Sequence, residues 1–188
     1  AGLTSRWWQQ QAGRLQSAGR EGLRLSAVTL AGLIFLQLVI GAHLRHLPVG
    51  ATAGGFKTAV FFHLLLAAVI LGYALLVVWR TLRLPGGQLR GPAILLNLLV
   101  LAQIGLGAAT WVLKYSWPAG ILADHGVVAG WTNTAGGGAQ SVIVTGHVAI
   151  GSLLLGLAVQ LSLRAWRLTS QPGLPRLAAA KSLWGGVG

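Results

Sequence analysis

The chain has 188 residues, of which 54% are hydrophobic and only 9% are charged. A soluble domain carries about 25% charged residues, so the composition excludes an ordinary water-covered surface and indicates a protein embedded in lipid. The net charge of +12 does not indicate nucleic-acid binding, because the basic residues lie between long apolar runs instead of forming a stripe. The absence of cysteine excludes disulfides, thiolate metal sites, iron–sulfur clusters and covalently attached heme.

Four apolar segments are each long enough to cross about 30 Å of hydrocarbon, which takes about 20 helical residues. They run from about Ser26 to Leu47, Lys57 to Trp79, Pro92 to Lys114 and Gln140 to Arg164. The sequence therefore predicts an all-α integral membrane four-helix bundle over residues 26–168, with a basic N-terminal tail (1–25) and a C-terminal tail (169–188).

The first segment carries polar residues toward its end. Gln37 lies inside the apolar run, and Gly41 follows one helical turn later. Arg45 and His46 close the segment, either as ordinary interfacial residues or as partners of anionic groups near the surface. His43 and His46 are three residues apart, but no acidic or thiol neighbour accompanies them, so an interfacial role is favoured for His43.

The later segments repeat this pattern and add two intramembrane histidines. In each histidine-bearing segment, a small residue follows the histidine by four positions, on the same helical face. One two-helix unit thus occurs twice in the same orientation, which predicts two hairpins related by an axis along the membrane normal. The first unit contains Gln37, Gly41, His63 and Ala67, and the second contains Gln103, Gly107, His147 and Gly151.

His63 and His147 are predicted to lie at one depth, roughly 10 Å below the same membrane boundary. An ionisable side chain in lipid is costly and tends to face the bundle interior. Two imidazoles at equal depth on repeat-related helices fit axial ligation of one heme iron from opposite faces. The alternative is that each histidine is simply a hydrogen-bonding group between helices.

The small and polar residues of the repeat fit the same hypothesis. Ala67 and Gly151 would leave room for a macrocycle below the histidines, and Gly41 and Gly107 would let its edge approach the backbone. The glycines equally fit close helix packing. Gln37 and Gln103 would join helices by hydrogen bonds or contact the cofactor, and Arg45 and His46, with Lys57 and Lys114, would meet the heme propionates. These last residues are all at the expected outer end.

The longest connection, from Tyr115 to Ala139, contains Trp117 and Trp131, which we interpret as interface anchors. Asp124 and His125 lie in the same connection. They are interpreted as solvated loop residues, with a proton relay or a cover over the heme edge as the alternative.

These residues resemble a known family. The run Gln37-Leu-Val-Ile-Gly-Ala-His-Leu-Arg-His46, then His63, the run Gln103-Ile-Gly-Leu-Gly-Ala108 and the run Gly146-His-Val-Ala-Ile-Gly-Ser152 are similar to the heme A synthase family. That family has two four-helix halves, each with a histidine on its second and fourth helices. The chain resembles one half over about residues 28–167, more like the half that carries a b-type heme.

The resemblance implies the four-helix fold and the two axial ligands. Catalytic halves of the family carry Glu three residues before the second-helix histidine and usually Arg after it, whereas this chain has Val60 and Leu64. The outer-loop cysteine pair of many members is also missing. The sequence therefore predicts a b-type cytochrome-like protein that transfers electrons or serves as a subunit of a respiratory membrane complex. The alternatives are a compact heme A synthase and a heme-free structural subunit.

Basic residues predict the orientation. Eleven of the fourteen Lys and Arg lie in the N-terminal tail, the Arg80–Arg90 connection and the C-terminal end, which must share one side. Both termini are therefore expected in the cytoplasm of a bacterial or archaeal cell, with the bundle in its inner membrane. Expected partners are the lipid bilayer and other membrane redox subunits or a second copy of the chain, with no nucleic acid.

Overall fold

The computed structural model describes residues 20–47, 51–84, 87–115 and 136–169. These residues form four long helices and contain no strand: α2 (Arg20–Arg45), α3 (Ala53–Leu82), α4 (Arg90–Tyr115) and α7 (Gly138–Thr169). All four are long and apolar enough to cross a membrane. The predicted all-α membrane bundle is thus confirmed, and lipid contact follows from the apolar side chains that cover the outside of the helices.

The helices extend beyond the predicted spans. Helix α2 begins at Arg20, before the expected start at Ser26, and α3 begins at Ala53 and continues to Leu82. Apolar content marks only the part of a helix that lies in hydrocarbon, whereas helical hydrogen bonds continue through the polar ends. Pro92 lies in the first turn of α4, as predicted, where its missing N–H costs nothing.

Local chemistry explains several helix ends. Thr52 is the N-cap of α3, and its Oγ1 accepts a hydrogen bond of 3.1 Å from the backbone N–H of Gly55. At the other end, Arg90 donates to the carbonyls of Leu82 at 3.0 Å and Leu84 at 3.2 Å. Gly87 has a φ of 62°, a left-handed conformation that glycine adopts without strain. Arg90 therefore closes α3 and starts α4.

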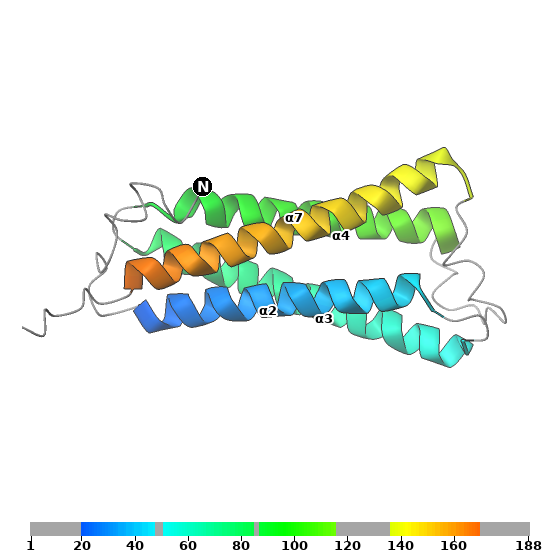
Figure 1. The fold of residues 1–188 in the computed structure, drawn as a ribbon, viewed down its shortest axis with the longest axis horizontal. Helices are drawn as coiled ribbons and strands as arrows, with labels where there is room; N and C mark the ends of the chain where they lie inside the picture. The colour runs from blue at the N-terminus through cyan, green and yellow to red at the C-terminus, as the bar shows by residue number, and fades with distance from the viewer. Residues whose placement is uncertain (1–19, 48–50, 85–86, 116–135, 170–188) are drawn as a thin grey trace, which may run out of the picture.

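The four helices form a ring in which α2 and α4 each contact both α3 and α7. Consecutive helices pair as two hairpins, α2 with α3 and α4 with α7, which lie one above the other in Figure 1. The hairpins are close together where α2 begins and α7 ends, and they diverge toward the other end. This arrangement matches the predicted repetition of one two-helix unit.

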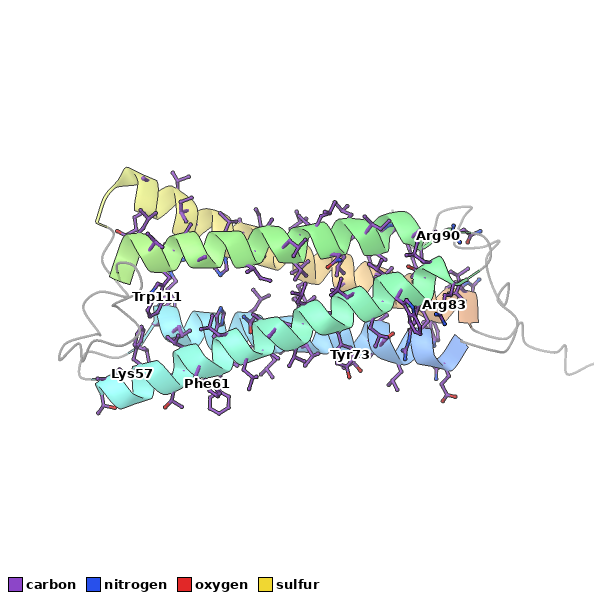
Figure 2. All side chains as sticks on the ribbon, turned by 180° about the vertical axis from the view of Figure 1, so that it is seen from behind. Lys57, Phe61, Tyr73, Arg83, Arg90 and Trp111 are labelled. Carbon is purple, nitrogen blue, oxygen red and sulfur yellow. The ribbon has the colours of Figure 1, made fainter. Side chains whose placement is uncertain are left out.

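We define two halves of the bundle by their residues. The arginine half comprises residues 20–34, 70–82, 90–100 and 154–169, and the histidine half comprises 37–45, 53–67, 103–115 and 138–151. Figure 2 shows Arg83 and Arg90 at one end and Lys57 and Trp111 at the other. The main apolar cluster lies in the arginine half and includes Leu30, Val77, Leu96 and Leu161, each at most 1% exposed.

A candidate bis-histidine site

The stripe of side chains that faces the bundle interior changes its chemistry between the two halves. In the arginine half, helix-periodic Leu, Ala, Val and Ile residues are buried on all four helices. In the histidine half, the same faces continue with glutamine, glycine, histidine and threonine. These residues are mostly half-buried. Helical periodicity therefore brings the repeated polar residues together inside the bundle.

The two histidines occupy equivalent places in the two hairpins. His63 lies ten residues after the start of α3 at Ala53, and His147 lies nine residues after the start of α7 at Gly138. At 1.5 Å per residue these separations are about 15 Å and 14 Å, so the depths agree within one residue. Both side chains are half-buried.

The glutamines connect the helices within each hairpin. The amide Nε2 of Gln37 donates to the carbonyl of His63 at 3.1 Å and lies 3.1 Å from the Nε2 of the same residue. The Nε2 of Gln103 donates to the carbonyl of His147 at 2.7 Å. The prediction that these glutamines join helices is confirmed, since each crosses from one helix to its hairpin partner.

Two of the glycines let the helices approach the imidazoles. A Cβ on Gly41 would lie 3.3 Å from the Cε1 of His63, and a Cβ on Gly107 would lie 3.4 Å from the Cε1 of His147. Each ring therefore rests against a glycine of its own hairpin. The symmetry of this contact supports the repeat at the level of side chains.

Gly151 has a different environment from the one expected below a ligating histidine. It is buried, and a Cβ there would lie 3.0 Å from the Cδ2 of Leu38 and 3.4 Å from the Nε2 of Gln103. Gly151 thus permits close packing of α7 against α2 and α4. Ala67 is half-buried at the corresponding place on α3.

Several buried polar atoms in the histidine half have no hydrogen-bond partner among the described residues. They include the Oε1 of Gln37, the Nδ1 of His63, the Oγ1 of Thr110 and the Nδ1 of His147. In the arginine half the Oδ1 of Asn97 is in the same situation. Unpaired buried polar atoms are rare and costly, so their concentration beside the two imidazoles marks this interior as a candidate binding site.

An apolar cluster lies beyond the imidazoles, at the end of the histidine half that contains Lys57 and Trp111. Leu47 and Phe56 are buried, and Val60 and Trp111 pack against them. The rings of Phe56 and Trp111 stack with centroids 6.3 Å apart. Sequence reasoning missed this cluster, although aromatic residues at the start of one helix and the end of the next were a signal for it.

The remaining predicted site residues lie at the rim or outside the described residues. Arg45 and His46 are exposed at the end of α2, and Lys57 is exposed in the first turns of α3. Lys114 belongs to α4. Trp117, Asp124, His125 and Trp131 lie outside the described residues.

Comparison of the chain with models of protein families, with curated proteins and with solved structures gives no match. A function for the chain is therefore inferred from the chemistry of the site.

Proposed function

We propose that this chain is a membrane b-type cytochrome-like protein that holds one heme between His63 and His147. The observation that carries the proposal is the pair of imidazoles at equal depth on repeat-related helices, inside an interior of small and unpaired polar residues. Heme b, when bound, supplies one-electron redox chemistry at its iron. Two axial histidines fill both axial positions, which suits electron transfer or a subunit role in a larger redox complex.

The donor set favours heme over a simple metal ion. The described residues contain no group of three or more His, Cys, Asp or Glu side chains that could hold a metal. A protein site for zinc or a similar ion takes three or four such ligands. A porphyrin brings four nitrogens of its own, so two imidazoles complete six-coordinate iron.

The rim fits the polar edge of a heme. The propionates are anionic, and Arg45 and His46 are exposed at the end of α2, beyond Gly41 in the same helix. Charge complementarity at the membrane surface would direct the propionates to that end. The other polar residues toward the cofactor are Gln37 and Gln103, with Gly41, Gly107, Ala67 and Gly151 as the small residues around it.

A compact heme A synthase is the enzymatic alternative. The resemblance to that family places Val60 where a catalytic half has a carboxylate. Val60 packs in the apolar cluster of Phe56 and Trp111, so this position offers an apolar contact instead of a proton acceptor. We therefore favour the non-catalytic function. A heme-free structural subunit is the second alternative.

The orientation and partners belong to the same proposal. The arginine half contains five arginines besides Arg20, and the only acid among the described residues is Glu21. This excess of positive charge supports a cytoplasmic location of both termini. An electron-transfer role requires neighbouring redox subunits or a second copy of the chain in a bacterial or archaeal inner membrane.

The test is a dithionite-reduced minus oxidised spectrum of the purified protein, with the heme extracted and identified. We expect a low-spin b-type spectrum and non-covalent heme b in a ratio of one per chain. A protein that purifies folded but without heme, even when heme is supplied during expression, would favour the structural subunit. Extraction of heme A would favour the enzyme.

A further inference from the structure

The two repeat-related histidines are inequivalent at the ring nitrogen. The Nε2 of Gln37 contacts both the carbonyl and the ring Nε2 of His63, each at 3.1 Å. Gln103 reaches only the carbonyl of His147, at 2.7 Å. No hydrogen bond joins the imidazole of His147 to another side chain among residues 20–47, 51–84, 87–115 and 136–169. The α2–α3 hairpin therefore has a glutamine contact at the Nε2 of its histidine, and the α4–α7 hairpin does not.

The chemistry of the amide determines which lone pair is engaged. The carbonyl of His63 only accepts hydrogen bonds, so its contact fixes the amide of Gln37 with the NH₂ group toward His63. An amide nitrogen carries two hydrogens and accepts none, so its second contact makes the Nε2 of His63 the acceptor. In a neutral imidazole the proton is then on Nδ1. The lone pair that accepts from Gln37 is the one that would bind iron.

The surroundings of the two rings are otherwise closely matched. Each Cε1 faces a glycine, at 3.3 Å from a Cβ on Gly41 for His63 and at 3.4 Å from a Cβ on Gly107 for His147. Each Nδ1 is buried without a partner among the described residues. The contact with Gln37 is therefore the feature that separates the two ligands.

We propose that Gln37 competes with iron for the Nε2 of His63, so that His147 is the resident axial ligand and His63 is the exchangeable one. The His63 face of the heme is then the face on which a small neutral diatomic molecule binds. This inference rests on the proposed heme function. A bound heme would be held by His147, and the Nε2 of His63, once released from iron, would accept the N–H of Gln37 and leave its position to the lone pair of the diatomic molecule. No net electron transfer occurs.

Carbon monoxide is the probe, titrated into the dithionite-reduced holoprotein and followed by its absorption change. The wild-type protein should bind it, with release of one imidazole. In Gln37→Leu no hydrogen bond stabilises the released His63 ring, so His63 should compete better with carbon monoxide for iron. The affinity for carbon monoxide should therefore fall about two- to tenfold, which is the effect of losing one hydrogen bond. Gln103→Leu removes a carbonyl bond of the same kind but no ring contact, so it should lower the affinity less than Gln37→Leu does. Gln160→Leu, at an exposed glutamine of α7 outside the site, is the control that should leave the affinity unchanged.

The histidine variants give an independent readout. His63→Ala should retain high-spin heme and bind one equivalent of carbon monoxide, whereas His147→Ala should lose most of its heme, because Gln37 competes with iron for the only remaining ligand, His63. Equal heme retention in the two variants would overturn the assignment. Equal effects of Gln37→Leu and Gln103→Leu on carbon monoxide affinity would also overturn it.

A measurement without heme separates this inference from the proposed function. In the heme-free full chain labelled with ¹⁵N-histidine, His63 should be the Nδ1–H tautomer with a hydrogen-bonded Nε2, and Gln37→Leu or Gln37→Met should shift that Nε2 while Gln103→Leu leaves it unchanged. If the His63 resonance does not shift in the Gln37 variants, Gln37 does not compete for the Nε2 of His63, even in a protein that binds heme. Failure of the wild-type chain to bind any heme would instead sink the proposed function.

Discussion

The two halves of the bundle use the same helical faces for different purposes. In the arginine half the inward stripe consists of interdigitated aliphatic residues, with Leu30 and Leu96 at 0% exposed. In the histidine half the stripe consists of His63, His147 and the glutamines, and the buried polar atoms there are incompletely paired. Packing in one half holds the helices together, and this allows the other half to keep polar side chains in its interior.

The difference also separates stability from function along each helix. In lipid, helices associate through packing and interhelical hydrogen bonds, since the tails are as apolar as leucine. The arginine half supplies the packing, aided by Ser162, whose hydroxyl donates to the carbonyl of Ala27 at 2.8 Å. Arg80 likewise donates to the carbonyl of Gly22. Changes in the two halves should therefore have distinct consequences.

The largest expected contrast is topological, because the two ends of the bundle should face opposite sides of the membrane. Gln88→Cys, exposed between α3 and α4, should react with a membrane-impermeant thiol reagent only after the cells are opened. Ala139→Cys, exposed at the start of α7, should react in intact cells. The chain has no cysteine of its own to interfere. Reaction of Gln88→Cys from outside would reverse the orientation.

Loss of either axial histidine should remove the low-spin spectrum entirely. His63→Ala or His147→Ala leaves at most five-coordinate iron, while the arginine half keeps the bundle folded, so helicity by circular dichroism should be unchanged. His43→Ala, exposed at the end of α2, is the control and should leave the spectrum intact. An unaltered spectrum in either membrane variant would refute bis-histidine ligation.

A core truncation in the arginine half should instead lower the stability of the bundle. Leu96→Ala removes a fully buried side chain and should lower the free energy of unfolding by about 2 kcal/mol. This is near the lower end for such cavities, because a side chain released from the core enters lipid instead of water. Leu98→Ala on the same helix is 58% exposed and should cost close to nothing. Unfolding in mixed micelles measures both. A Leu96→Ala protein as stable as Leu98→Ala would mean that the arginine half does not hold the bundle together.

Much of this organisation was predictable from the sequence, for physical reasons. The length of each apolar run predicted a membrane-spanning helix, and the spacing of Gln37, His63, Gln103 and His147 predicted the repeated hairpin. The partners across helices were not predictable in the same way. The approach of Leu38 to Gly151, at 3.0 Å from a Cβ, and the Phe56–Trp111 stack depend on helix rotation and crossing. Apolar periodicity gives the inward face but not the residue it meets.

Gly151 sharpens the boundary between the halves, because it lies where packing gives way to the site. Gly151→Leu should disrupt the contact with Leu38 and Gln103, destabilise the protein by about 1–3 kcal/mol and weaken heme retention. Gly156→Leu, five residues further along α7 with nothing within 4 Å of its Cβ position, is the matched control. If both variants retain heme and stability equally, close packing at Gly151 is not required.

The last prediction is a negative result, in which the chain by itself produces no heme A. Oxidising a heme methyl group requires removal of electrons and protons with a nearby group to manage charge. A carboxylate three residues before His63 would share its helical face, but Val60 occupies that place and packs against the cluster of Leu47 and Phe56.

The chain's two acids are Glu21 and Asp124, and neither occupies that sequence position. Glu21 lies in the first turn of α2, in the arginine half and far from the imidazoles. Asp124 belongs to the connection between α4 and α7, outside the described residues, and it is the residue through which an enzymatic function would have to operate. The experiment is expression in a host that makes heme O but lacks heme A synthase, followed by extraction and chromatography of the hemes. Heme A or its hydroxylated precursor in the extract, lost on Asp124→Asn, would replace the electron-transfer proposal with the enzymatic one. An unchanged heme profile in both proteins is the outcome that an apolar residue at Val60 predicts.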